Sequence, residues 1–405
     1  MVSLDLRTRS DDDVDPIDVG EFFDQRLPAL ASVGADLVIP GALELGIRPM
    51  TVVMDQGSWT LTVTPASVQV QPGDRGHSRV RLDADELTDI VHDLVTPMTF
   101  LTAGTLDMDR GNLGDFLDWW VVLRSLIDGV AVHTTGSIGF RDRRGDPLDL
   151  HTSFAPDDDP DDLAHFLAEA GYLHLRGVFT EEEMAQVSED MDAAIPSYRP
   201  DDGRSWWART SAGEHRAVRL QWFQEQSPIT TELLADDRFL AIGRLTSDGH
   251  RARVEGNRVE ALVKPIGVVE GISDVPWHKD CSLGRHSYQC CGLTVGISVT
   301  GADERSGQLA VVAGSNRALV QPAFARPGWG LPLVDLPTRT GDVTVHTSCT
   351  MHMSHPPVDQ ERRVMYTGFS LPARSGDAAR PHIDHIAKVR EQAHRVVSQA
   401  PGHTG

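Results

Sequence analysis

Short stretches in which apolar and polar residues alternate mark the first third of the chain. Residues 59–63 (Trp-Thr-Leu-Thr-Val) and 68–70 (Val-Gln-Val) have a period of two, and the Gln-Pro-Gly-Asp sequence at 71–74 ends the second stretch. This pattern is typical of half-buried strands joined by turns. Residues 83–94 change to helical spacing after an acidic first turn. Strands followed by a helix predict a small α+β unit over residues 19–139.

A second unit begins with helical patterns and continues with strands. Residues 161–167 and 180–183 have the acidic first turns of helices, and a turn and strand separate them at 171–177. From 258 to 369 the chain becomes strand-like and is interrupted by glycines, for example around residues 293–299. Many short strands without intervening helices predict a β-sandwich or jelly roll.

The length of 405 residues also favours two domains over one core. Acidic residues at the start predict a solvated tail, and a run of Asp and Pro at 157–162 predicts an exposed linker. We therefore expect a disordered acidic tail at 1–18, an α+β domain at 19–139, a linker at 140–160, a jelly-roll domain at 161–376, and a C-terminal helix and tail at 377–405.

Composition excludes several classes of partner. The net charge of -22 and the pI near 5.1 argue against nucleic acid, which binds basic surfaces. We see neither a secretion signal nor a run of about eighteen apolar residues, and so expect a cytoplasmic protein without a membrane span. The cysteines lack CxxC spacing, which favours reduced thiols over a disulfide framework or zinc ribbon. They are Cys281, Cys290, Cys291 and Cys349.

Histidines and one aspartate in the second unit have spacing suited to a metal ion. His278 and Asp280 alternate, so that on an extended strand both side chains would point to one face. A third ligand could come from His346, His352 or His355. Two imidazoles and one carboxylate form the arrangement that leaves open coordination positions on non-haem Fe(II).

Four motifs in order make residues 161–372 resemble the phytanoyl-CoA dioxygenase family of Fe(II)- and 2-oxoglutarate-dependent oxygenases. They are residues 171–177 after the opening helix; His-Lys-Asp at 278–280; Gly-Gln-Leu at 307–309 with Gly-Ser-Asn at 314–316; and Gly-Asp at 341–342 leading to His352 and Arg363. The resemblance implies a double-stranded β-helix (jelly roll) with flanking helices. It implies that His278, Asp280 and His352 bind iron, and that Arg363, 363 - 352 = 11 residues after the distal histidine, binds 2-oxoglutarate.

Other side chains near these motifs are candidates for cosubstrate binding. The planar fork of Arg363 matches a carboxylate, whereas strand parity predicts that Arg362 faces elsewhere. Lys264 is a second cation on an apolar strand; it could anchor cosubstrate or substrate, or be a solvated edge lysine. Thr294 could donate its hydroxyl into a barrel interior, although alternation alone does not distinguish inside from outside.

The first unit resembles the sterol-carrier-protein fold through its strand meander, the helix after Asp85 and the passage at residues 103–111. The resemblance leaves open whether this domain binds a lipid or mediates docking or dimerisation, so a homodimer is possible. Its histidines, His77, His92 and His133, have no carboxylate in ligand spacing. We therefore expect the chemistry, and the metal, to belong to the second unit alone.

The expected activity is oxidation of a C–H bond in a small molecule, with 2-oxoglutarate and O2 as cosubstrates and succinate and CO2 as products. The substrate could be lipid-like or a natural-product intermediate, and hydroxylation, desaturation and cyclisation stay open. Two alternatives use the same residues differently. One is a zinc hydrolase with the same ligands, since zinc also accepts two histidines and a carboxylate. The other is a lipid-binding carrier with an inactive oxygenase domain.

Overall fold

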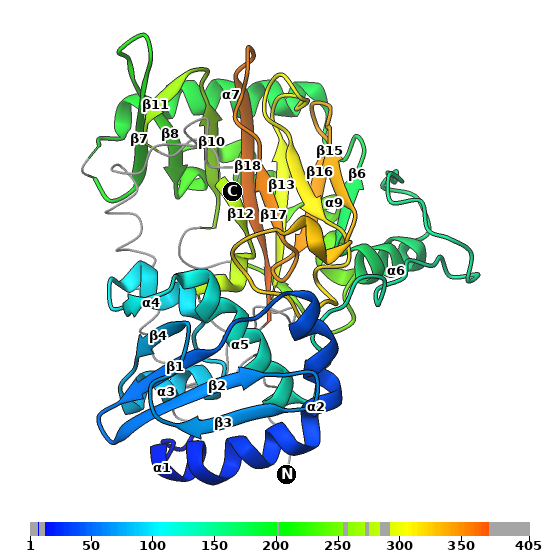
Figure 1. The fold of residues 1–405 in the computed structure, drawn as a ribbon. Helices are drawn as coiled ribbons and strands as arrows, with labels where there is room; N and C mark the ends of the chain where they lie inside the picture. Colours follow the sequence, from blue (N-terminus) through cyan, green and yellow to red (C-terminus); the bar gives the residue numbers. More distant parts are fainter. Residues whose placement is uncertain are drawn as a thin grey trace.

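The computed structural model describes residues 7, 13–200, 202–253, 258–271, 275–283 and 292–371. Two units, each built around sheet, are stacked on one another, with the N-terminal unit below the larger C-terminal unit in Figure 1. Most of the predicted acidic tail and the whole of the predicted C-terminal helix lie outside the described residues.

The N-terminal unit is a mixed α/β structure around a five-stranded sheet of order β3-β2-β1-β4-β5. The predicted meander is present in β1–β3, and β4 then pairs with β1 in parallel. The strands are β1 (Met50–Met54), β2 (Gly57–Val63), β3 (Val68–Pro72), β4 (Ser78–Arg81) and β5 (Asp107–Arg110). The helices are α1 (Val19–Glu21), the π-turn η3 (Phe22–Arg26), α2 (Leu27–Glu44), α3 (Ala84–Val91), α4 (Pro97–Ala103) and α5 (Leu113–Asp128).

Two long helices of this unit were not expected from the strand pattern. Helix α5 is buried along most of its length and packs against α2, β1 and β4. The continuous helix Val19–Glu44, which contains α2, is long and apolar enough to cross a membrane by length and composition alone. The same features occur in core helices of globular domains, and α2 contacts α5, β2 and β3. The hydrophobic run therefore has a packing partner within the domain.

The C-terminal unit consists of two antiparallel sheets. The larger, nine-stranded sheet has the order β11-β7-β8-β10-β18-β13-β16-β6, with β9 paired to β18, and the four-stranded sheet has the order β12-β17-β14-β15. The larger sheet comprises β6 (Tyr172–Leu175), β7 (Ser205–Thr210), β8 (His215–Gln221), β9 (Arg251–Ala252), β10 (Glu260–Lys264), β11 (Val268–Glu270), β13 (Gly292–Ser298), β16 (Val343–Thr347) and β18 (Arg362–Ser370). The smaller comprises β12 (Val275–His278), β14 (Leu309–Val312), β15 (Leu333–Leu336) and β17 (His352–Ser354). This is the architecture expected of a jelly roll.

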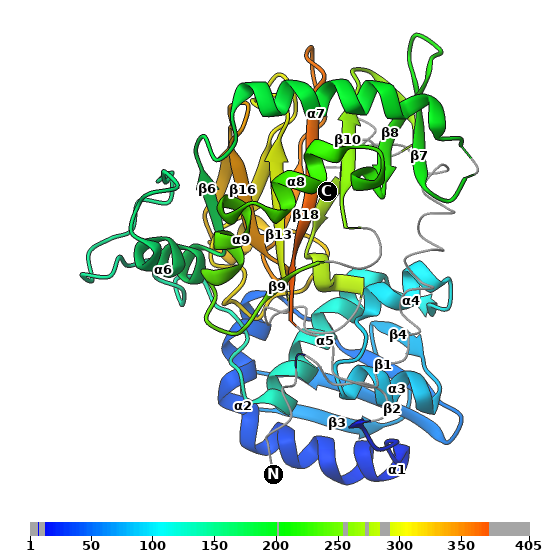
Figure 2. The ribbon, with the colours of Figure 1, turned by 180° about the vertical axis from the view of Figure 1, so that it is seen from behind.

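Helices cover the outer face of the larger sheet, as Figure 2 shows for α7 and α8. Leu293, Val295 and Ile297 of β13 point to this face and join the main hydrophobic core. Because side chains alternate along a strand, Thr294 and its alternate neighbours point to the opposite face. The helices are α6 (Pro160–Ala170), α7 (Glu181–Ala194), α8 (Pro228–Ala235) and α9 (Asp237–Arg244). The inner face of the sheet is thereby left for the functional site.

The segment predicted as a linker is packed rather than extended through solvent. Phe154 is buried in the core of the C-terminal unit and forms a bridge with Leu175 of β6. The Asp-rich run is partly helical, since Asp159 caps α6 and Arg143 pairs with Asp159 and with the Asp161 carboxylate of the first turn. The acidic composition of residues 157–162 correctly indicated that this segment is exposed to solvent. The segment forms the start of helix α6, however, and not a flexible connection.

Candidate functional site

His278 and Asp280 lie on either side of a sharp turn. His278 is the last residue of β12, and Asp280 is the first residue of the 3-10 turn η6 (Asp280–Leu283). The expectation that both side chains project from one extended strand is therefore wrong in its local geometry. The turn nevertheless places the Nε2 atom of His278 3.4 Å from Oδ1 of Asp280.

His352 reaches the same place from a neighbouring strand. It begins β17, which pairs with β12 so that His352 and His278 are register partners, and their ring centroids are 4.2 Å apart. The chain crosses from the larger to the smaller sheet between His346 on β16 and His352 on β17. His355 points away from the group: it is 38 % exposed and its Nε2 lies 2.9 Å from Asp335 Oδ1.

The three side chains offer one ligand atom each within 4.8 Å of one another, which makes them a candidate metal centre. Asp280 Oδ1 lies 3.4 Å from His278 Nε2 and 3.5 Å from His352 Nε2. The Nδ1 atom of His278 is 2.7 Å from the Pro276 carbonyl, and that of His352 is 3.0 Å from the Thr350 carbonyl. Donation by both Nδ1–H groups leaves the two Nε2 lone pairs for a cation.

The second carboxylate oxygen of Asp280 is held from the larger sheet. Thr294 on β13 donates its hydroxyl to Oδ2, and Nε2 of His346 lies 3.4 Å from the same atom. Thr294 and His346 are register partners on β13 and β16. Thr294 was expected to contact the cosubstrate; the structure places its hydroxyl on a candidate metal ligand instead. His346 is 1 % exposed, and within the described part of the chain neither of its ring nitrogens meets the criteria for a hydrogen bond.

Electrostatics favour the protonation states that bind a metal. Burial raises the pKa of Asp280, but nearby His352 and hydrogen bonding from His278 outweigh burial and bring that pKa well below its usual value. Although the Asp280 side chain is 31 % exposed, protein surrounds its carboxylate closely. Burial and the neighbouring imidazoles of His346 and His278 lower the pKa of His352. Neutral imidazoles and an ionised carboxylate are the forms that coordinate divalent cations.

A pair of buried cations lies further along the inner face of the larger sheet. Lys264 on β10 is 1 % exposed, and its Nζ donates to Ser354 Oγ and to the His355 carbonyl, both at 2.6 Å. Arg362, its register partner on β18, is 2 % exposed and donates to the Gly307 carbonyl at 2.7 Å. Ser354 follows His352 by two residues on β17, so both side chains point to the same side of that strand.

Arg363 does not belong to this group. Its guanidinium donates to the carbonyl and hydroxyl of Ser188 at 3.0 Å and pairs with Asp192 at 2.8 Å, both on helix α7. The structure thus reverses the predicted orientations of Arg362 and Arg363. The spacing of eleven residues from His352 had selected Arg363, but the parity of β18 turns Arg362 inward. The Nε atom of Arg362 is buried and has no hydrogen-bond partner among the residues that the structure describes.

Comparison with known proteins identifies the family of the domain that carries these residues. Residues 167–365 match the sequence model of the family described as phytanoyl-CoA dioxygenase (PhyH). The C-terminal domain belongs to the phytanoyl-CoA dioxygenase family. The matched range contains every candidate residue described above and all strands of both sheets except the end of β18 beyond residue 365. No curated protein matches the chain in sequence.

Several solved structures resemble this domain at low sequence identity. AviO1 from Streptomyces viridochromogenes Tue57 is 20 % identical, with a TM-score of 0.43 over 55 % of this chain and 98 % of its own. The epimerase SnoN from nogalamycin biosynthesis, in complex with Fe3+, alpha-ketoglutarate and nogalamycin RO, is 20 % identical, with a TM-score of 0.42 over 55 % and 92 %. EctD from S. alaskensis with 2-oxoglutarate and 5-hydroxyectoine is 18 % identical, with a TM-score of 0.43 over 59 % and 86 %. Similarities at this level do not identify a substrate.

The match over residues 167–365 makes the C-terminal domain a non-haem oxygenase that depends on Fe(II), 2-oxoglutarate and O2. The residues present fit these groups. The donor set of two imidazoles and one carboxylate is the set that non-haem Fe(II) oxygenases use. Two buried cationic groups suit a dicarboxylate: the ammonium group of Lys264 and the guanidinium of Arg362, whose Nε has no hydrogen-bond partner among the described residues.

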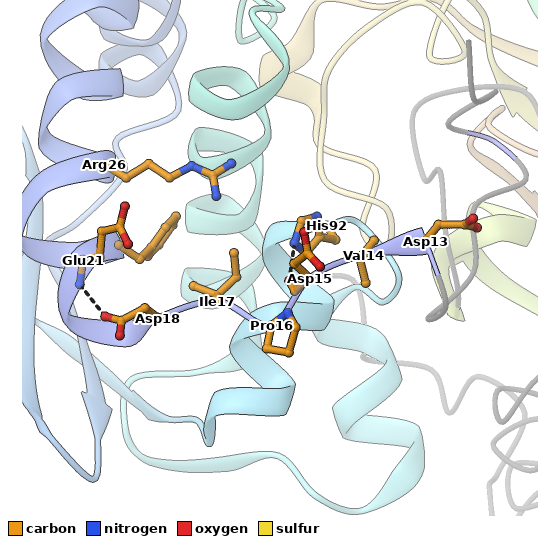
Figure 3. A pocket seen from close by; sticks show the side chains of 10 residues that line it. Asp13, Val14, Asp15, Pro16, Ile17, Asp18, Glu21, Arg26 and His92 are labelled. Carbon is orange, nitrogen blue, oxygen red and sulfur yellow. Dashed lines mark hydrogen bonds between the residues drawn. The ribbon is translucent and has the colours of Figure 1, made fainter. Parts of the chain in front are cut away.

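A separate hollow of about 300 Å³ lies in the N-terminal unit (Figure 3). Acidic residues of the segment before α1 and of α1 line it, together with Arg26 and His92, whose ring Nε2 lies 3.1 Å from the Asp15 carbonyl. It is remote from the oxygenase residues and holds no side chain named in the metal or cation groups. We assign it no role in the reaction.

Proposed function

We propose that this protein hydroxylates, or otherwise oxidises, a C–H bond of a small molecule at the centre formed by His278, Asp280 and His352. The observation that supports this proposal is that the two carboxylate oxygens of Asp280 have different partners. One carboxylate oxygen lies between two imidazole Nε2 atoms, and Thr294 and His346 face the other oxygen. A carboxylate fixed at one oxygen is prepared to coordinate through the other.

Iron would be held by His278, Asp280 and His352, and the distal carboxylate of 2-oxoglutarate by Arg362, Lys264 and Ser354. Arg362 takes the role first assigned to Arg363, because only Arg362 faces the inside of the barrel. When bound, iron and 2-oxoglutarate supply the oxidising chemistry, in which O2 and the keto acid are consumed and succinate and CO2 are released. The chain contributes binding, orientation and charge neutralisation.

Strand β17 joins the candidate metal centre to the pair of buried cations. His352 and Ser354 alternate on β17, so their side chains lie about 6–7 Å apart on the same face. Val364 on β18 and Leu262 on β10, also register partners, have the same parity as Arg362 and Lys264 and give this stretch an apolar wall. A short dicarboxylate with a polar group at each end and a methylene chain between matches these surroundings. This arrangement favours an oxygenase, whose cosubstrate always carries a distal carboxylate, over a zinc hydrolase, which would use the two cations only if its own substrate carried such a group.

The remaining assignments are also proposals. We propose a lipid-like or natural-product substrate, a cytoplasmic location, and a boundary between an N-terminal domain at 19–139 and an oxygenase domain at 161–376. The likeness of the first domain to a sterol carrier stays a prediction, as does a homodimer. The mixed five-stranded sheet and its buried helices are compatible with the likeness to a sterol carrier. No contact with nucleic acid is proposed for a chain with a net charge of -22.

Anaerobic addition of Fe(II) and 2-oxoglutarate to the metal-free protein should produce the weak visible absorption band of a keto acid chelated to iron. The band is expected because the three ligands would hold Fe(II) while the two cations hold the distal carboxylate, so that the keto-acid end of 2-oxoglutarate meets the iron. Titration of 2-oxoglutarate at fixed Fe(II), followed by absorption, gives the measurement. Addition of Zn(II) in place of Fe(II) is the control and should give no band. A protein that retains zinc, takes up no iron and shows no band would contradict the oxygenase function.

A further inference from the structure

The N-terminal domain reaches the turn that carries Asp280. Helix α4 contacts η6, and Thr96, the residue that caps α4, donates its hydroxyl to the carbonyl of Ser282 in that turn. Thr96 is fully buried, with 0 % of its surface exposed. A hydrogen bond in such a place is shielded from competing water, and its loss would leave the Ser282 carbonyl without this donor.

The capping geometry of α4 leaves the Thr96 hydroxyl proton available for this contact. Its oxygen accepts from the backbone amide of Met98 at 3.2 Å, while the Thr99 hydroxyl oxygen lies 3.3 Å from the Thr96 amide. The hydroxyl oxygen therefore acts as acceptor within the helix, and its proton is donated across the domain boundary. A serine at this position could make both bonds, whereas a valine could make neither.

The turn is held from other directions as well. Within it, the Ser282 amide donates to the Lys279 carbonyl at 2.9 Å. From the connection between β16 and β17, the Ser348 carbonyl accepts from the Cys281 amide at 3.3 Å. A single 3-10 turn has few hydrogen bonds of its own, so its position depends on such external partners. Among the described residues, Thr96 supplies such a partner from the first domain.

A second connection joins the same turn to the first domain through residues 315–330. Lys279, which separates the two ligands, donates its amide to the Pro322 carbonyl and its ammonium group to the Ser315 carbonyl, each at 2.9 Å. The same segment enters the first domain, where Leu319 joins its hydrophobic core. Arg326 also pairs with the buried Asp118 of α5 at 3.0 Å.

We propose that the first domain is a structural part of the metal centre, and that Thr96 is a positioning residue that fixes the turn carrying Asp280. This inference rests on the proposed function, because it takes Asp280 as a metal ligand. Outer partners of metal ligands commonly contribute about 10- to 100-fold in metal affinity, because they set ligand orientation. It also departs from the expectation that the first domain is dispensable for metal binding.

The test is the affinity of full-length variants for Co(II), measured anaerobically by its visible absorption, with no substrate present. Thr96→Val should weaken Co(II) binding about tenfold or more, and Thr96→Ser should restore it. Thr180→Val is the matched control: Thr180 caps α7 in the same way, and its hydroxyl accepts from the Glu183 amide, far from the ligands. The control removes a helix cap and should leave metal affinity unchanged.

Three results would overturn the inference. They are wild-type Co(II) affinity in Thr96→Val, equal loss in Thr96→Val and Thr180→Val, and failure of Thr96→Ser to restore binding. Thermal unfolding of each variant separates a general loss of stability from a specific loss of metal affinity. Asp280→Ala distinguishes this inference from the proposed function. If that variant binds Co(II) like the wild type, then Asp280 is not a ligand and the proposed metal centre itself is wrong.

Discussion

Replacement of Arg362 by leucine is expected to weaken 2-oxoglutarate binding strongly while iron stays bound. Arg362 lies inside the barrel beside Ser354 and Lys264, and it contacts none of the three candidate ligands. Loss of a charge-assisted contact to a carboxylate costs on the order of 2–4 kcal/mol. The dissociation constant should therefore rise about thirty- to several-hundred-fold. Titration of the Fe(II)-loaded variant with 2-oxoglutarate, followed by the visible band, gives the value.

Arg363→Leu is the matched control, one residue along the same strand. It removes the contacts with Ser188 and Asp192 on α7 and should leave 2-oxoglutarate affinity within about threefold of the wild type. The reverse outcome, a weakened Arg363→Leu and an unchanged Arg362→Leu, would return the role to the residue that family spacing selects. Unchanged affinity in both variants would leave Lys264 as the principal anchor.

His352→Ala and Asp280→Ala are each expected to lose iron, because each removes one of the three ligand atoms of the candidate metal centre. The loss should exceed the 10- to 100-fold typical of outer partners, and activity should fall with it. Metal content of the purified variants after loading with Fe(II) under anaerobic conditions gives the measurement. His355→Ala is the control, since its imidazole pairs with Asp335 on the exposed edge of the smaller sheet.

His346→Ala tests whether His346 or His352 is the distal metal ligand. His346 faces Asp280 Oδ2 and its ring centroid is 4.0 Å from that of His352, but it is outside the group whose ligand atoms converge. The variant should retain iron with reduced affinity, within the range for outer partners. Iron-replete His352→Ala, or iron-free His346→Ala with intact binding in His352→Ala, would reassign the distal ligand.

The sequence was sufficient for the class of fold and for the convergence of the three residues of the candidate metal centre. The alternation in residues 293–299 and the glycine-rich strand pattern predict a sheet that the structure contains as β13 and its neighbours. His278, Asp280 and His352 converge as their types and order indicate. Local pattern succeeds here because the alternation of strand side chains is a property of the strand itself.

Orientation across a turn could not be predicted in the same way. The loop between β17 and β18 sets the phase of β18, and a shift of one residue moves every side chain to the opposite face. Residue counting from His352 therefore chose Arg363 over Arg362. The contact of Thr96 with the turn after Asp280 spans 186 positions in the chain and leaves no periodic signal. Such contacts depend on how the two domains pack.

If 2-oxoglutarate binds at Lys264 and Arg362 as proposed, the position of these two cations opposite each other on adjacent strands would also make the stability of the folded chain depend on its cosubstrate. Like charges directly opposite each other in a sheet destabilise it, and the unfolded chain separates them in water. A dicarboxylate that binds only the folded form shifts the equilibrium by mass action, by about 2.7 kcal/mol at a hundred times its dissociation constant. The protein would then resist unfolding and proteolysis best when keto acid is abundant, so that its lifetime follows the supply of its own cosubstrate.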